Sequence, residues 1–324
     1  MQPGRSMITV VSGGVGAARL LRGAATVVAP DKLVTIVNTG DDTVMHGLAI
    51  SPDLDTVTYT VSGSIDPERG WGLSDEAWTT MQALDRFTAV RPAESHAGEN
   101  WFGLGNRDLA THFYRTTRLA EGATLAQVTA EITRAFGIEF CVLPMSNDRV
   151  STIVTLADGT DVAFQEYFVK LRHDVPVRAV RFEGTSVARP LGLDELRASR
   201  AVVIAPSNPI VSIGPMRALP GFDEALSSRR DTVVAVSPIV AGAALKGPAD
   251  RMLTELGHDA SVVGVARLYA PIAGTLVVDA ADAALAPQVE AAGMRCVVAD
   301  TIMKTPEVAA ALTRTCLAAV GVTA

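Results

Sequence analysis

The chain has 324 residues, a formal net charge of -7 and a sequence pI near 5.3, and 48% of its residues are hydrophobic. This length and hydrophobic content can bury a sizeable core. The acidic balance provides no basic stripe, which argues against DNA or RNA as a partner. Cys141, Cys296 and Cys316 are too widely spaced for a zinc site or a disulfide framework, so we expect reduced thiols in the core.

The beginning of the chain gives no sign of export. Residues 1–6 lead directly into an apolar run at 7–11, which is too short for a secretory signal. No stretch reaches the length that spans a membrane. We therefore expect a cytoplasmic protein that has no membrane partner.

The opening residues predict a βαβ unit. An apolar strand at 7–11 is followed by a glycine-containing turn and by a helical pattern over 17–28, and a second buried strand covers 33–37. Polar residues cluster at 38–42, directly after this strand. Ligands bind at the carboxyl ends of strands in parallel sheets, so we expect a site there.

The middle of the chain has a different pattern. Helices are predicted near residues 74–87, 107–120 and 124–136, between loops rich in Gly, Trp and Pro. We interpret residues 62–137 as a helical insertion that contributes to an acceptor pocket. Residues 1–61 and 138–324 then form the core.

Short apolar segments predict the remaining strands. They lie at 140–143, at 150–156 paired as a hairpin with 160–164, and at 177–182, 201–205, 232–236, 261–265, 275–278 and 295–298. Because helical segments separate most of them, we expect an α/β fold with a doubly wound, mainly parallel, Rossmann-like sheet.

A glycine loop, formed by Ser12, Gly13, Gly14, Val15 and Gly16, follows the first strand. Glycines let backbone N–H groups approach a phosphate at the positive end of a helix. The dinucleotide motif would have a third glycine, and its second strand would end in an acid where this chain has an asparagine. The Lys-Ser/Thr pair of a P-loop is also absent. A turn that serves only helix packing is an alternative.

Four aspartates follow the first two strands: Asp41, Asp42, Asp53 and Asp55. Mg²⁺ usually takes one or two carboxylates, and phosphate oxygens and water complete its coordination. Together with the glycine loop, the cluster predicts a diphosphate bridged by Mg²⁺. Helix capping is an equally good explanation for Asp53, so Asp55 is the stronger functional candidate.

Two later loops also follow buried strands. The loop at 205–215 could bind a purine base or ribose, although a turn that satisfies its own backbone has the same composition. Its candidate nucleotide-binding residues are Ser207, Asn208, Pro209, Ser212 and Gly214. The loop at 237–248 carries Lys246, which suits a phosphate as a point charge.

Trp71 and Trp101 lie in Gly-rich parts of the insertion. Either could stack on a planar heterocycle, and the alternative is a core anchor. The five histidines have no metal-like spacing, and no Gly-x-Ser-x-Gly elbow occurs. Acyl catalysis is therefore disfavoured.

Six short motifs occur in one order along the chain: SGGVGA at 12–17, NTGDD at 38–42, SPDLDTV at 51–57, LGNRD at 104–108, PSNP at 206–209 and SPI at 237–239. In this combination the chain resembles the 2-phospholactate transferase family of coenzyme F420 biosynthesis. The frequent use of Arg and Ala suggests the actinobacterial phosphoenolpyruvate transferase branch.

This resemblance implies a Mg²⁺-dependent transferase. It would move a phosphoenolpyruvyl or 2-phospholactyl group from a GDP-linked donor to the terminal hydroxyl of the deazaflavin Fo, with release of GMP. The product would be dehydro-F420-0 or F420-0. The family also suggests a homodimer.

The resemblance further implies roles for individual residues. Asp55 is expected to orient the acceptor hydroxyl, to act as a base and to contact the metal with Asp41, and Asp42 is a further catalytic candidate. Residues expected at the acceptor site are Asp55, Trp71, Gly103, Arg107 and Asp108. The family motif usually has an aspartate where this chain has Asn106, so no role that needs charge is expected there.

A different class of protein is also compatible with part of the sequence. Bacterial gluconeogenesis and cell-shape factors, which bind nucleotide sugars without catalysis, have a similar glycine loop and a similar Asp pair. The motifs at 51–57 and 104–108 favour the transferase.

Overall fold

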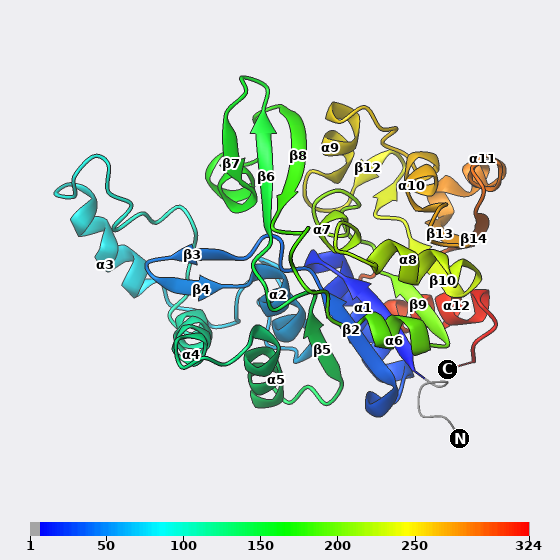
Figure 1. The fold of residues 1–324 in the computed structure, drawn as a ribbon, viewed down its shortest axis with the longest axis horizontal. Helices are drawn as coiled ribbons and strands as arrows, with labels where there is room; N and C mark the ends of the chain where they lie inside the picture. Colours follow the sequence, from blue (N-terminus) through cyan, green and yellow to red (C-terminus); the bar gives the residue numbers. More distant parts are fainter. Residues whose placement is uncertain (1–6, 324) are drawn as a thin grey trace.

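The computed structural model describes residues 7–323, so residues 1–6 and 324, which the sequence analysis assigned to the core, lie outside the described residues. Seven parallel strands form the central sheet, in the order β14-β13-β10-β9-β1-β2-β5 (Figure 1). Their bounds are β1 Ile8–Ser12, β2 Leu33–Val37, β5 Cys141–Pro144, β9 Ala201–Ile204, β10 Val233–Val236, β13 Thr275–Asp279 and β14 Arg295–Ala299.

The path of the chain creates a switch point beside β1. From β1 the chain passes to β2 and β5 on one side, then returns to β9 on the other side and continues outward. This is the doubly wound Rossmann order with one further edge strand. The predicted fold class is confirmed, and the carboxyl ends of β1 and β9 flank the position where such folds bind ligands.

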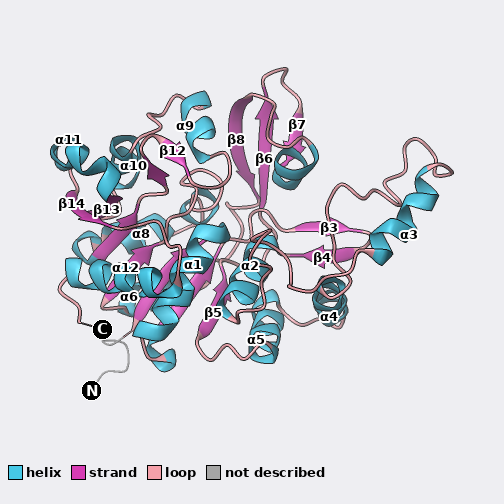
Figure 2. Cartoon of the chain, turned by 180° about the vertical axis from the view of Figure 1, so that it is seen from behind, coloured by secondary structure: helices cyan, strands magenta, loops and turns pink. Residues whose placement is uncertain are grey.

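Helices cover both faces of the sheet (Figure 2). Val10 shares a core with α1 (Gly14–Val27), α2 (Pro52–Val61) and α12 (Pro306–Ala319). Its neighbour Val11 packs on the opposite face, with the core formed by the helices α6 (Leu193–Ala198), α8 (Phe222–Ser227), α10 (Val262–Tyr269) and α11 (Ala286–Ala291). Successive strand residues point to opposite faces, so a continuous apolar strand can be covered on both sides.

A hairpin that the sequence analysis did not anticipate follows β2. Its strands β3 (Thr43–Met45) and β4 (Leu48–Ile50) are antiparallel and extend away from the central sheet, with α3 (Thr79–Thr88) at their far end in Figure 1. Met45 shares a small apolar core with Leu104 of the insertion. The hairpin therefore packs with the insertion rather than with the sheet.

The predicted insertion contains three helices, as expected: α3, α4 (Asp108–Ala120) and α5 (Leu125–Ala135). The last of these packs against the edge strand β5. The expected limits of the insertion, at residues 62 and 137, stay a prediction.

A second antiparallel sheet has the order β7-β6-β8. It contains the predicted hairpin, β6 (Ser151–Leu156) and β7 (Asp161–Ala163), and Figure 1 shows it standing out from the central sheet. The strand predicted at 177–182 also forms, as β8 (Val177–Glu183). It pairs with β6 rather than with the parallel sheet.

Two sequence-based predictions are wrong. Residues 261–265 begin helix α10 rather than form a strand, because Ser261 caps the N–H groups of Val263 and Gly264. A short buried apolar run does not distinguish the two structures. The thiol of Cys141 is exposed, whereas Cys316 is buried as expected.

The remaining elements are short. They are η2 Pro30–Lys32, η3 Glu166–Lys170, α7 Gly214–Arg217, η4 Arg230–Thr232, β11 Ile239–Val240, β12 Ala243–Ala244, α9 Ala249–Glu255 and η5 Ala280–Leu285. Within residues 7–323, no helix combines the length and the apolar character needed to cross a membrane.

Candidate active site

Two loops from neighbouring strands meet at the switch point. The backbone N–H of Gly13 donates to Ser207 Oγ over 3.2 Å. A Cβ at Gly16 would clash with the carbonyl oxygen of Pro206, and one at Gly13 would lie 2.7 Å from the Cβ of Ser212. Glycine is therefore required where the loops touch, and the two predicted nucleotide-binding segments lie side by side.

Some of the predicted nucleotide-binding residues have local structural roles. The Ser12 hydroxyl is buried and hydrogen-bonds Thr35 Oγ1 over 2.8 Å, inside the sheet. Asn208 Oδ1 accepts from the N–H of Ile210 over 2.9 Å and so satisfies its own turn. Gly14 and Val15 open α1, where the first N–H groups have no partner within the helix. The phosphate-binding capacity of the loop thus lies in its backbone.

A surface hollow of about 520 Å³ lies next to the second loop. Pro209 and Gly214 line it together with Phe182 and Arg217, and neither the glycine loop nor the aspartate cluster does. Ser212, in contrast, faces Gly13. Pro209 and Gly214 are therefore separated from the part of the loop that meets the glycines.

Asn38, at the end of β2, holds two of the four aspartates. Its Nδ2 donates to Asp53 Oδ2 over 3.0 Å and to Asp41 Oδ1 over 3.3 Å. Gln165 donates to the other oxygen of Asp41 over 2.9 Å. Asp53 also accepts from the N–H of Gly14. The Asp53 side chain is thus directed at the glycine loop. It does not cap α2, because Ser51 is the N-cap residue of that helix.

The charges of this cluster are poorly compensated. Asp41 and Asp53 are buried and Asp42 is half-buried, and none of the three forms a salt bridge within residues 7–323. Ser51 donates to Asp42 Oδ2 over 2.7 Å, whereas Asp42 Oδ1 has no hydrogen-bond partner. A buried carboxylate oxygen without a donor is costly unless a cation or a proton neutralises it.

Burial raises the pKa of all three carboxyl groups. It raises the pKa of Asp42 to about 8 and that of Asp53 to about 6. For Asp41, burial and then the charges of Asp53 and Asp42 raise the pKa well above its usual value. The cluster would therefore bind either protons or a cation near neutral pH.

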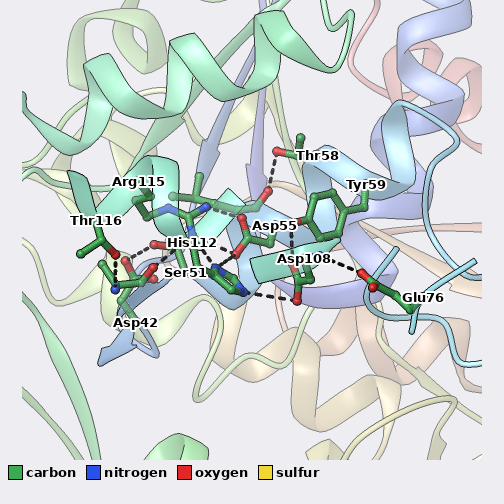
Figure 3. A network of polar contacts seen from close by, with 12 residues as sticks. Asp42, Ser51, Asp55, Thr58, Tyr59, Glu76, Asp108, His112, Arg115 and Thr116 are labelled. Atoms are coloured by element: carbon green, nitrogen blue, oxygen red, sulfur yellow. Dashed lines mark hydrogen bonds and ion pairs between the residues drawn. The ribbon is translucent and has the colours of Figure 1, made fainter. Parts of the chain in front are cut away.

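Asp55, in contrast, has a cationic partner. Both of its carboxylate oxygens accept from the guanidinium of Arg115, with 3.1 Å between Nη1 and Oδ2. Burial disfavours the charge on Arg115, but Asp55 outweighs this effect and the pKa of the guanidinium is raised. Figure 3 shows this pair within a network that continues through His112 to Asp108 and Tyr59.

The predicted acceptor residues divide into two groups. Trp71 is 44% exposed and packs edge to face against Trp78, and the Arg69 guanidinium lies 5.5 Å from its ring centroid. A Cβ at Gly103 would lie 3.2 Å from the Trp71 ring. These residues form an aromatic platform that can stack on a planar heterocycle.

The second group lies in the motif at 104–108. Arg107 donates to the carbonyl of Ser74 over 2.7 Å, and Asp108 is buried and accepts from the Tyr59 hydroxyl over 2.6 Å. The Asn106 amide donates to Thr79 Oγ1 over 2.6 Å. These side chains hold the loop at 103–108, the predicted acceptor loop, in which Asn106 contributes an amide donor.

Lys246 reaches across to the insertion. A Cβ at Gly70 would clash with its ammonium group, so the two residues touch. Burial and the nearby charge of Arg19, on α1, lower the pKa of Lys246. Neither cation has an acidic partner within the described part of the chain. Two neighbouring positive charges near the glycine loop favour a bound anion.

Arg115 and His112 are residues of this network that were not predicted from the sequence. A signal was available, because Asp108, His112 and Arg115 recur at intervals of four and three on a predicted helix and so share one face. That face is buried in the structure, where Arg115 is 2% exposed.

Comparisons with known proteins decide the family. The sequence profile described as "2-phospho-L-lactate transferase CofD" matches residues 8–316. The chain belongs to the CofD family. It is a transferase of coenzyme F420 biosynthesis, of the type that transfers a phosphoenolpyruvyl or 2-phospholactyl group to Fo. The alternative of a non-catalytic regulator is therefore not retained.

Relatives of this CofD chain carry the name phosphoenolpyruvate transferase. The protein from Kitasatospora aureofaciens is 40% identical over 96% of this chain and 97% of its own length. The Streptomyces griseus protein is 41% identical, also over 96% and 97%, and that of Mycobacterium ulcerans is 39% identical over 98% and 99%.

A solved structure of a UPF0052 family member from Bacillus halodurans shares the fold. It has a TM-score of 0.59 and 17% identity, and the match covers 96% of this chain and 99% of that one. This likeness confirms the architecture alone.

Proposed function

We propose that this CofD chain uses a GDP-linked phosphoenolpyruvyl donor and forms dehydro-F420-0, with the phospholactyl donor as the alternative. The relatives named phosphoenolpyruvate transferase support this choice of donor. One observation carries the assignment of the site. The glycine loop, the loop after β9 and the buried aspartates meet at the switch point of the sheet.

The donor diphosphate is assigned to the glycine loop. The N–H of Gly14 already binds Asp53, so the N–H groups of Val15 and Gly16 at the start of α1 would bind its oxygens, and the positive end of the helix faces them. Arg19 and Lys246 add charge on the same side. We place the guanosine near Ser207 and Ser212, where the second loop touches the first.

The acceptor is assigned to the insertion. The ring of Fo would stack on Trp71, and its terminal hydroxyl would point toward Asp55. The hydroxyl oxygen bonds to the phosphorus of the donor while the bond between that phosphorus and the GMP oxygen breaks. The hydroxyl proton passes to a carboxylate, for which Asp55 is the candidate. Arg115 binds both oxygens of Asp55 and so fixes the plane of this carboxylate.

The aspartate cluster fits Mg²⁺. Asp42 Oδ1 has no hydrogen-bond donor, and within residues 7–323 none of the three carboxylates forms a salt bridge; a bound cation would satisfy both features. No group of three or more His, Cys, Asp or Glu residues among 7–323 could hold a metal ion by itself. A site made by these carboxylates would therefore need phosphate oxygens and water to complete it, and Mg²⁺ bound there would neutralise the diphosphate.

The choice of metal ligands changes from the sequence-based expectation. Asp41 stays a proposed ligand. Asp53 replaces Asp55 beside it, because Asn38 joins Asp41 to Asp53 whereas Arg115 holds Asp55. Asp42 is the third carboxylate of the cluster. A homodimer and a cytoplasmic location remain further parts of the proposal.

A direct assay tests the function. The protein is incubated with Fo, Mg²⁺ and either the phosphoenolpyruvyl or the phospholactyl derivative of GDP, and GMP and product mass are followed. We expect GMP and dehydro-F420-0 in equal amounts with the first donor, and less product with the second. Release of GMP without a new deazaflavin product would contradict the transfer, and a preference for the second donor would reverse the donor assignment.

A further inference from the structure

A buried ion pair joins the insertion to the core at the proposed acceptor site. Arg115 comes from α4 of the insertion, and Asp55 comes from α2 of the core. The side chains are 2% and 8% exposed. Two parallel hydrogen bonds from a planar guanidinium fix the plane of a carboxylate, which a single contact from a lysine cannot do.

His112 extends this pair toward the acceptor loop. Its Nδ1 lies 3.2 Å from Arg115 Nη1 and 3.8 Å from Asp55 Oδ2. A guanidinium only donates, so Nδ1 must accept and the proton must reside on Nε2. Nε2 lies 3.3 Å from Asp108 Oδ2, close enough for an ion-pair contact but without the alignment of a hydrogen bond. His112 thus lies between the Asp55 pair and a second buried carboxylate.

Asp108 anchors the acceptor loop to the same network. Contacts from His112 and Tyr59 outweigh the effect of burial and lower the pKa of Asp108. Glu76 accepts from the N–H groups of Arg107 and Asp108, at 2.8 Å each, where α4 begins. Figure 3 shows the chain of contacts running from Glu76 to Arg115. The loop that precedes α4 and the Asp55 carboxylate are therefore held by one set of side chains.

We propose that Arg115 and His112 are positioning residues of the transfer reaction. Arg115 fixes the orientation of the Asp55 carboxylate, and His112 couples that carboxylate to the acceptor loop through Asp108. The acceptor site is thus complete only when α4 is docked on α2. This inference rests on the proposed function, in which Asp55 faces the acceptor hydroxyl.

Stability alone does not account for the pair. Buried ion pairs can often be replaced by apolar residues of similar volume without loss of stability. The same helix also offers a comparison, because Arg118 makes two contacts of 2.9 Å with Glu131 and its side chain is 32% exposed. That pair joins α4 to α5 and contacts no residue of the proposed site.

The test compares Arg115→Lys with Arg118→Lys. We expect Arg115→Lys to lower kcat at least about tenfold, because the charge remains while the carboxylate loses its fixed plane. The Kd for GDP, measured by calorimetry, should change less than about twofold, and Arg118→Lys should leave kcat unchanged. In an Asp55→Asn background, Arg115→Lys should cause little further loss, because residues that act through one group are not additive.

Two variants of His112 test its coupling to Asp108 separately from the positioning role of Arg115. In His112→Gln the amide nitrogen can still donate toward Asp108, whereas in His112→Asn it is too short to do so. We therefore expect His112→Asn to raise KM for Fo at least about fivefold more than His112→Gln does. Equal KM values for the two variants would overturn the coupling.

Other results would overturn the positioning role of Arg115. They are a normal kcat for Arg115→Lys, an equal fold-loss in the Asp55→Asn background, or a loss that matches the unfolded fraction seen by circular dichroism. If the wild-type chain itself does not turn over Fo, the proposed function fails instead. A crystal structure of Arg115→Lys still decides the inference in that case, since an unchanged Asp55 orientation would contradict it.

Discussion

The side-chain amide of Asn38 donates to Asp53 over 3.0 Å and to Asp41 over 3.3 Å, and so ties the end of β2 to the first turn of α2. In dinucleotide-binding folds an acid at this strand end accepts from a ribose. Here the residue faces two acids and must donate. The feature that argued against a nicotinamide cofactor is thus also what holds the aspartate cluster together.

Replacing this donor with a third acid should destabilise the protein. Asn38→Asp removes the donor and adds a carboxylate beside two others, so we expect a loss of at least about 2 kcal/mol at pH 8. Urea denaturation in the presence of a chelator measures it. Exposed Asn147 accepts from the N–H of Ala126, and Asn147→Asp should cost less than about 0.5 kcal/mol. Equal losses would contradict the role of Asn38.

The raised pKa values predict that the metal-free protein loses stability as the pH rises. Asp42 and Asp53 have pKa values of about 8 and about 6 in the folded chain, and about 4 when unfolded. The folded state therefore binds more protons, and its advantage is complete below pH 4 and lost as the pH rises toward 8.

Thermal unfolding measures this effect. With a chelator present, we expect the Tm to fall from pH 5 to pH 8, and Mg²⁺ should restore more of it at pH 8 than at pH 5. Asp53→Asn should flatten the slope because one titrating group is removed. A Tm that rises over this range in the chelated protein would contradict the pKa assignments.

Because the glycine loop and the loop after β9 touch at Gly16, one added methyl group there should strongly weaken GDP binding. A Cβ at Gly16 would clash with the Pro206 carbonyl, so Gly16→Ala should separate the loops and weaken GDP binding at least about tenfold. Gly47, unlike Gly16, has a positive φ, of 78°, and its Cβ would meet nothing within 4 Å. Gly47→Ala should cost about 1 kcal/mol of stability without affecting GDP. Calorimetric titration with GDP compares them, and normal binding by Gly16→Ala would argue against the loop contact.

The sequence predicted the elements that carry strong periodicity or glycine signals. The seven-stranded sheet follows from continuous apolar segments, and the glycine loop follows from Gly13, Gly14 and Gly16. The β3–β4 hairpin was not predicted, because its apolar core depends on Leu104, which is distant in the chain. The pairing of Arg115 with Asp55 was not predicted for the same reason, since the two residues are 60 positions apart. Pairings between separate elements are set by tertiary packing, which local patterns do not encode.

Asp55→Asn should separate chemistry from nucleotide binding. The substitution removes the charge that we propose faces the acceptor hydroxyl, so we expect kcat to fall at least about a hundredfold while the Kd for GDP stays nearly unchanged. It also leaves the buried Arg115 without a counter-charge, and a stability loss of about 3 kcal/mol should accompany it. Rates are therefore compared per folded molecule. Near-normal turnover would exclude Asp55 from the reaction.

Lys246 gives the last prediction, because it touches Gly70 of the insertion and lies near Arg19 of α1. A cation between Gly70 and the glycine loop should bind the donor phosphates, and no acid within the described residues forms a salt bridge with it. Lys246→Gln should therefore raise KM for the donor about tenfold, the effect of about 1.4 kcal/mol of lost binding, and leave KM for Fo unchanged.

Lys304→Gln is the matched control, since Lys304 is exposed and the change in net charge is the same. It should leave both KM values unchanged. The effect of Lys246→Gln should also shrink as salt is added, because a partly exposed charge is screened. If both lysine variants change KM for the donor equally, the overall charge and not a phosphate contact is responsible. If KM for Fo rises instead, Lys246 serves the acceptor loop through Gly70, and Arg19 is left as the candidate phosphate-binding cation.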